Sequence, residues 1–114
     1  MGENSFVTIS DSSVQYCGFD SLIYIDTNEK EFLGHYEINN SKFIGIIGYE
    51  GSILNIKEIN DKATVTFNNS IFRENFSMYR GAVVYSQSNS ANLYVSFNNC
   101  VFKDNISIYG INIK

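Results

Sequence analysis

A four-fold internal repeat runs through this chain of 114 residues and constrains its fold more than any other feature. Each copy reads large apolar, polar, Asn or Asp, small, any residue, apolar. The copies begin at residues 9, 38, 67 and 97, so the spacings are 29, 29 and 30 residues. Self-similarity at a fixed period of this length is typical of proteins built from stacked repeats.

The pattern inside each copy is that of short β-strands. Val65-Thr66-Phe67 and Val95-Ser96-Phe97 alternate with period two and then reach an Asn-Asn turn signal. We therefore predict an all-β fold, a parallel β-helix (solenoid) of about four coils with three short strands in each coil of about 29 residues. Residues 1–114 then form a single β-helix module with coils starting near 7, 36, 65 and 95, expected to be a fragment of a longer repeat protein.

Stacked coils place equivalent residues directly above one another, so the repeat also predicts ladders of like side chains. Some of these residues should form an aromatic stack inside the coil, and others an amide ladder in its interior. A further set follows the strand where the chain must bend, and Asn accepts the left-handed backbone that a bend requires. We expect the amides of this set to hydrogen-bond along the stack. The aromatic stack consists of Phe43, Phe72 and Phe102, the interior amide ladder of Asn75 and Asn105, and the set at the bend of Asn40, Asn69 and Asn99.

A glycine precedes an apolar stretch in three of the copies. Gly51, Gly81 and Gly110 are therefore predicted to mark a second bend with positive φ.

Two segments resemble a known repeat family. Phe72-Arg73-Glu74-Asn75 and Phe102-Lys103-Asp104-Asn105 are similar to the F-x-x-N element of polymorphic membrane protein repeats. Arg80-Gly81-Ala82-Val83 is similar to their G-G-A-[ILV] element, with Arg80 in place of the first glycine. The resemblance is clear over 64–114 and weakens towards the N-terminus. It implies a right-handed parallel β-helix, as in pectate-lyase-like proteins, and extracellular display, adhesion or scaffolding. The composition also resembles that of anaerobic-fungal scaffoldin modules, whose partners are dockerins.

Acidic residues and a histidine, which often form active sites, are present but do not cluster in the sequence. Acidic residues are scattered: Asp26, Glu29 and Glu31 fall in one predicted loop, and the equivalent loop at 86–92 has none. His35 is the single histidine and is interpreted as a loop residue. We therefore expect no catalytic residue, no metal site, no cofactor and no enzymatic activity.

The two cysteines fall in different columns at opposite ends of the stack, too far apart for a disulfide. Cys17 and Cys100 are therefore predicted to be free, largely buried thiols.

Tyrosines give the best indication of binding. Tyr49, Tyr79 and Tyr109 recur just before the predicted glycine bend, so stacked coils would align them in a stripe. Such a stripe is either a packing ladder or a binding strip for a protein or a sugar, since Tyr is enriched at interfaces. The sequence favours a non-catalytic protein-interaction module of an extracellular scaffold or adhesin, with these tyrosines as partner-binding residues. The alternatives are a carbohydrate-binding β-helix module that binds a cell-surface glycan, and a fragment of a polysaccharide lyase or hydrolase.

Charge narrows the range of partners. The formal net charge is −4, with 8 basic and 12 acidic side chains, and no basic patch of the kind that binds nucleic acid is visible. No apolar run approaches the roughly 20 residues that span a bilayer, so we expect no membrane insertion by this segment. Uncovered strand edges at the ends of a solenoid invite pairing, so we expect them to be covered by further coils of a longer array, by caps or by end-to-end self-association.

Overall fold

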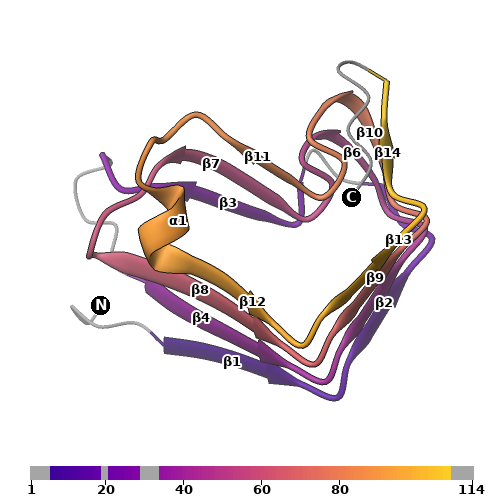
Figure 1. The fold of residues 1–114 in the computed structure, drawn as a ribbon, viewed down its shortest axis with the longest axis horizontal. Helices are drawn as coiled ribbons and strands as arrows, with labels where there is room; N and C mark the ends of the chain where they lie inside the picture. The colour runs from indigo at the N-terminus through magenta and orange to yellow at the C-terminus, as the bar shows by residue number, and fades with distance from the viewer. Residues whose placement is uncertain (1–5, 19–20, 29–33, 109–114) are drawn as a thin grey trace.

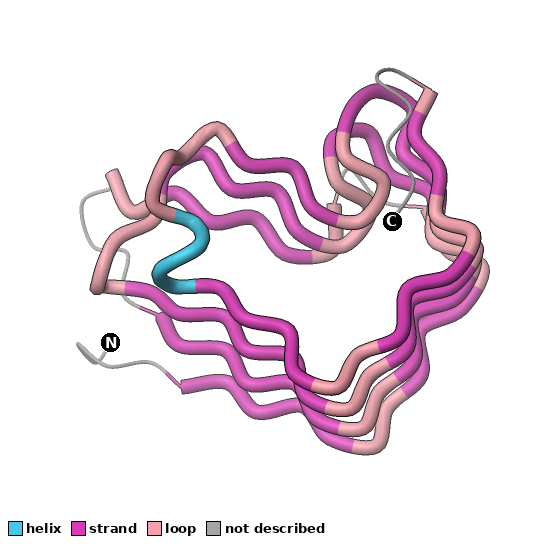
Figure 2. Tube along the Cα trace, in the orientation of Figure 1, coloured by secondary structure: helices cyan, strands magenta, loops and turns pink. Residues whose placement is uncertain are grey.

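The structure is a computed structural model that describes residues 6–18, 21–28 and 34–108. It is an all-β parallel solenoid of about three turns with about 29 residues per turn, which confirms the predicted fold class (Figure 1). The second and third coils each contain four strands rather than the predicted three, because the chain folds outward once more before it closes the coil (Figure 2).

Strands of equivalent position stack into four parallel sheets. Sheet 1 contains β1 (Phe6–Ser10), β4 (Gly34–Asn39), β8 (Ala63–Asn68) and β12 (Val95–Asn98). Sheet 2 contains β2 (Ser13–Gln15), β5 (Lys42–Ile44), β9 (Ile71–Arg73) and β13 (Val101–Lys103). Sheet 3 contains β6 (Ile47–Glu50), β10 (Phe76–Arg80) and β14 (Ile106–Ser107). Sheet 4 contains β3 (Ile23–Asp26), β7 (Leu54–Glu58) and β11 (Val84–Ser86).

The number of turns is smaller than the predicted four. Sheets 3 and 4 have three strands each, so a complete set of four strands does not recur four times in the described residues. In the first coil the place of sheet 3 is taken by an isolated bridge from Gly18 to Ile47. In the last coil the described residues end after β14, before sheet 4 is reached.

The strand register follows the sequence repeat. Val65 pairs with Val95 and Phe67 with Phe97, at a separation of 30 residues. The same positions of β4 and β8 pair at a separation of 29 residues. The repeat therefore identified which residues stack.

The corner between sheets 1 and 2 is made by one residue in each coil with a left-handed backbone. Asn40, Asn69 and Asn99 have φ values of 53°, 53° and 55°, as predicted for this bend. The corner between sheets 2 and 3 uses the same conformation but was not predicted, because its residues share no chemical type. They are Tyr16, Gly45, Glu74 and Asp104.

The predicted amide ladder at Asn40, Asn69 and Asn99 is wrong by one residue. These side chains are exposed at the corner. The ladder is formed instead by the preceding asparagines, which lie in regular strand conformation and point the same way in each coil. Asn68 Nδ2 donates to Asn39 Oδ1 at 2.8 Å, and Asn98 Nδ2 donates to Asn68 Oδ1 at 2.9 Å.

The core contains two adjoining phenylalanine columns. Phe72 stacks between Phe43 and Phe102, with centroids at 5.1 and 4.9 Å and interplanar angles of 8° and 11°. Phe67 stacks on Phe97 at 4.9 Å and 4°. Rings of different columns meet edge to face, as Phe67 and Phe72 do at 5.2 Å and 74°. Offset stacking and edge-to-face contact are the two favourable aromatic geometries, and here they alternate through the core.

Sheet 4 returns to sheet 1 through loops of different length. In the third coil this return contains the short helix α1 (Ala91–Tyr94), which the sequence did not predict. α1 lies beside β12, where the chain passes from sheet 4 to sheet 1 (Figure 1). Across the described ranges, no helix is long and apolar enough to cross a membrane.

Candidate functional site

The outward fold of sheet 3 forms a projecting ridge, defined here as β6, β10 and β14 with the turns that follow β6 and β10. In Figure 1 these strands rise from the corner after sheet 2, and the chain then reverses to enter β7 and β11. Gly51 and Gly81 make the reversal with φ values of 70° and 68°. A Cβ on either glycine would overlap a backbone carbonyl oxygen, of Leu54 and Val84 respectively. These two glycines confirm the predicted second bend, and Gly110 lies outside the described residues.

The inside of the ridge holds only small side chains because the chain doubles back so closely. Gly48, Ser77 and Ser107 form one register column, and all three are buried. The hydroxyl oxygen of Ser77 lies 2.6 Å from the carbonyl oxygen of Tyr49 and 2.9 Å from that of Arg80. Ser52 Oγ donates to the carbonyl oxygen of Ala82 at 2.7 Å. These hydroxyls satisfy backbone carbonyls in a space that no large apolar side chain could share.

The outside of the ridge is therefore where its large side chains must lie. Ile47, Phe76 and Ile106 occupy one register row, and Ile47 and Ile106 are 48% and 46% exposed. Met78 and Ile108 continue the same face and are 55% and 57% exposed. We call these five residues the apolar face of the ridge. A contiguous apolar surface of this kind marks an interaction site more often than a scatter of single exposed residues does.

The predicted tyrosine stripe borders this face. Tyr49 and Tyr79 stack with ring centroids 5.4 Å apart and an interplanar angle of 18°. A β-bulge in β10 between Ser77 and Arg80 brings Tyr79, rather than Met78, over Tyr49. Tyr109 lies outside the described residues. The two rings therefore pack on each other, and Tyr49 is still 52% exposed.

Arg80 completes the border of the ridge. Its Cζ lies 4.7 Å from the ring centroid of Tyr79, a cation–π distance. A side-chain hydrogen bond to Tyr85, and the charge interaction with Tyr79, raise the pKa of Arg80 above its ordinary value. The guanidinium is therefore a fixed positive charge at the edge of the apolar face.

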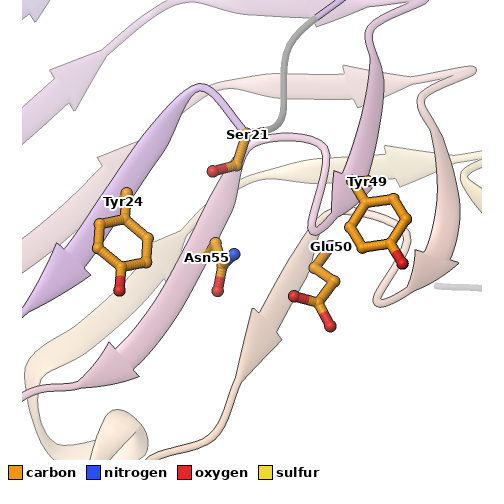
Figure 3. Close-up of a pocket in the computed structure, with 5 residues that line it drawn as sticks. All are labelled: Ser21, Tyr24, Tyr49, Glu50 and Asn55. Atoms are coloured by element: carbon orange, nitrogen blue, oxygen red, sulfur yellow. The ribbon is translucent and has the colours of Figure 1, made fainter.

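A pocket of about 410 Å³ lies between the ridge and the outer face of sheet 4. Its lining comes from β3, β6, β7 and the segment before β3: Ser21, Tyr24, Tyr49, Glu50 and Asn55. Tyr24 and Tyr49 stand on opposite sides, and Asn55 and Glu50 lie between them (Figure 3). Tyr24 is 48% exposed, and Asn55 Oδ1 is buried with no hydrogen-bond partner among the described residues. Sequence reasoning missed Tyr24 and Asn55 because only the tertiary fold brings sheet 4 beside the ridge.

The interior amides form a second polar feature, placed inside the coil rather than at a surface. Asn75 and Asn105 are 1% and 0% exposed. Asn75 Nδ2 lies 3.0 Å from both Asn105 Oδ1 and the carbonyl oxygen of Phe43. Asn75 Oδ1 accepts from the backbone N–H of Ile46 at 2.9 Å. These asparagines hold the corner between sheets 2 and 3 and do not face a ligand.

The histidine and the acidic residues, which could act in catalysis or bind a metal, lie apart from one another in the structure. His35 lies in β4 rather than in a loop, with its Nδ1 2.8 Å from Thr64 Oγ1, so its predicted placement was wrong. Asp26 closes a local turn by accepting from the backbone N–H of Asn28 at 3.1 Å, and Glu29 and Glu31 lie outside the described residues. Within the ranges that the structure describes, no three His, Cys, Asp or Glu side chains gather into a group that could hold a metal ion.

Both cysteines are free, as predicted, but they are half-buried rather than largely buried. Cys100 occupies a column whose other members are serines. Cys17 occupies a different column, whose members in the following coils are Ile46, Asn75 and Asn105. Both lie in coils at the ends of the described stack, where a neighbour covers them from one side only.

The fold and these surfaces define a parallel β-solenoid with an apolar ridge and a tyrosine-lined pocket. Neither a protein-family model, nor a curated protein, nor a solved structure matches this chain.

Proposed function

We propose that this chain is a non-catalytic protein-interaction module, and that it binds its partner through the apolar face of the ridge. The observation that carries the proposal is the outward placement of that face. Five large apolar side chains share one side of the ridge. Four of them are each about half exposed: Ile47, Met78, Ile106 and Ile108. The tight reversal at the glycines leaves no interior space for them, so the exposure is built into the fold.

The chemistry of the ridge favours a protein partner over a glycan on this surface. Isoleucine side chains cannot hydrogen-bond sugar hydroxyls, and the methionine thioether is only a weak acceptor, but both gain about 25 cal/mol per Å² when another apolar surface covers them. Tyr79 and Arg80 lie at the border, and Tyr and Arg are the residue types that most often dominate protein interfaces. The complementary partner has an apolar centre and a carboxylate positioned to meet Arg80.

The setting proposed for this module is an extracellular scaffold or adhesin. It rests on the resemblance of residues 64–114 to polymorphic membrane protein repeats, and the resemblance to scaffoldin modules makes dockerin-type modules the first partners to test. A stacked solenoid suits such a role because it holds an exposed face rigidly over several coils.

The proposal is tested by comparing two single variants with the wild-type chain. Met78→Glu places a charge in the apolar face, and Leu93→Glu places one at an apolar residue on α1 that is even more exposed. Secreted proteins retained by immobilised wild type and Leu93→Glu, but not by Met78→Glu, are identified and purified. Calorimetry with the purified partner, including dockerin-type modules, should then give at least about a tenfold weaker affinity for Met78→Glu.

Equal affinity of all three chains for the purified partner would contradict the proposal. Circular dichroism of each variant confirms that the solenoid is intact before binding is measured. Size-exclusion chromatography is run in parallel, because a wild-type dimer that Met78→Glu dissociates would assign the face to self-association instead.

A further inference from the structure

The pocket beside the ridge has the features of a small-ligand site that is separate from the apolar face. It is lined by side chains from two surfaces that meet at an angle, the outer side of sheet 4 and the base of the ridge. Its volume of about 410 Å³ falls within the range of ordinary ligand pockets. The lining combines two aromatic and three polar side chains, whereas the apolar face has no polar group among its five members.

The two tyrosines of this pocket offer flat apolar surfaces. In Figure 3 the rings of Tyr24 and Tyr49 both present a flat face towards the viewer. Tyr49 stacks on Tyr79 through one face of its ring, so its other face is the one available to a ligand. With Tyr24 at 48% exposure and Tyr49 at 52%, both rings remain about half accessible in the folded chain.

The polar groups between the rings are good partners for hydroxyls. Glu50 brings two carboxylate oxygens that accept hydrogen bonds, and Ser21 both donates and accepts. Asn55 lies between the two rings, and its buried Oδ1 has no partner among the described residues. Rotation of this amide towards the open side would give the oxygen a hydroxyl donor from a ligand.

We propose that this pocket binds a neutral saccharide, with a pyranose ring laid on Tyr24 or Tyr49 and its hydroxyls on Glu50 and Asn55. A pyranose combines an apolar C–H face with a rim of hydroxyls, which matches flat rings flanked by a carboxylate and an amide. Glu50 is the one charged group in the lining, so an acidic sugar is repelled. This site does not depend on the proposed protein-binding role of the ridge.

The test uses three oligosaccharide probes of similar length: cellohexaose and mannohexaose, which are neutral, and a galacturonate hexamer, which is acidic. The chain has 8 tyrosines and no tryptophan, so its intrinsic fluorescence comes from all the tyrosines together and detects binding without locating it, while calorimetry gives the affinity. At least one neutral probe should bind saturably, and Tyr24→Ala should weaken that binding at least about tenfold. Tyr24→Phe keeps the ring face and should stay within about threefold of wild type.

Two further variants test the charge preference of the pocket and its independence from the ridge. Glu50→Gln removes the repulsion and should narrow the preference for neutral over acidic probes. Met78→Glu, which alters the apolar face, should leave saccharide binding unchanged, so failure of one proposal does not imply failure of the other.

Absence of saturable binding of both neutral probes up to about 10 mM would overturn the proposal, as would equal binding by Tyr24→Ala or tighter binding of the galacturonate hexamer. Displacement of a bound saccharide is also attempted with an extended peptide, and a peptide that binds this pocket when no saccharide does would assign it to a protein ligand.

Discussion

Asn75 and Asn105 are joined by a side-chain hydrogen bond of 3.0 Å across consecutive coils, and both are essentially fully buried. Each amide also donates to the backbone carbonyl of a phenylalanine in the preceding coil, Phe43 and Phe72 respectively. These bonds satisfy backbone groups at a corner where the strand ladder is interrupted. The pair therefore holds the corner between sheets 2 and 3.

Substitution of Asn75 by Leu tests this role with the same number of side-chain heavy atoms and the same branching. The change leaves the N–H of Ile46 and the carbonyl of Phe43 without their amide partner inside the coil. We expect a loss of about 2–4 kcal/mol in the free energy of unfolding, measured by urea denaturation. Asn98→Leu is the matched control, because Asn98 is exposed and its side chain, within the described residues, donates to the side-chain amide of Asn68. It should cost less than about 1 kcal/mol. Equal losses for the two variants would show that the buried amide has no special role.

Truncation of the aromatic column should cost more in the middle than at its end. Phe72 is fully buried, and its ring contacts four others: Phe43, Phe67, Phe97 and Phe102. Phe72→Ala should lower the free energy of unfolding by about 3–5 kcal/mol. Phe102 is half-buried and is stacked on one described neighbour in its column, so Phe102→Ala should cost about 1–2 kcal/mol. A larger effect at Phe102 than at Phe72 in thermal or urea denaturation would contradict a core in which each coil is buried by its neighbours.

The glycine reversal that builds the ridge should not tolerate a side chain. Gly51→Ala combines a φ of 70° with a Cβ that overlaps the Leu54 carbonyl oxygen, so we expect a loss of about 2–4 kcal/mol. Gly18→Ala is the control, since Gly18 has an ordinary φ and the nearest atom to its added Cβ is 4.0 Å away. The control should change the free energy of unfolding by less than about 0.5 kcal/mol in the same denaturation experiment. A tolerated Gly51→Ala would mean that the chain can reverse by another route and that the ridge is not fixed by this residue.

The periodicity of the sequence was sufficient to predict the coil and its register, because a stacked repeat allows only one alignment of equivalent residues. The column of Phe43, Phe72 and Phe102 follows directly from that alignment. The fourth strand of each coil did not follow, because the inside of the ridge is made of Gly48 and Ser77, which carry no strand signal. Small residues are required there by the tight reversal, which is a tertiary feature.

The misplaced amide ladder has a different cause. In Asn39-Asn40 and its equivalents both residues are asparagine, and the prediction assigned the bend and the side-chain ladder to the same, second residue. The bend was placed correctly: Asp11, which aligns with Asn40, also has a left-handed backbone, with φ 53°. The second residue is exposed at the corner, so the hydrogen bonds along the stack are made by the strand residue before it, as Asn68 and Asn39 do. The pocket had no signal in the sequence, because Tyr24 and Tyr49 come together only when sheet 4 folds back beside the ridge.

The column that contains Cys100 supplies a final prediction. Its equivalents in the preceding coils are serines: the Oγ of Ser41 accepts from the N–H of Ser12 at 3.3 Å, and the Oγ of Ser70 from that of Ser41 at 3.2 Å. A hydroxyl at position 100 would continue this ladder, so Cys100→Ser should leave the free energy of unfolding within about 0.5–1 kcal/mol of wild type. Ser70→Ala removes the acceptor from a fully buried site without adding volume, and it should cost about 1–3 kcal/mol. Urea denaturation of both variants measures the difference, and a more harmful Cys100→Ser would show that the thiol packs differently from the serines of its column.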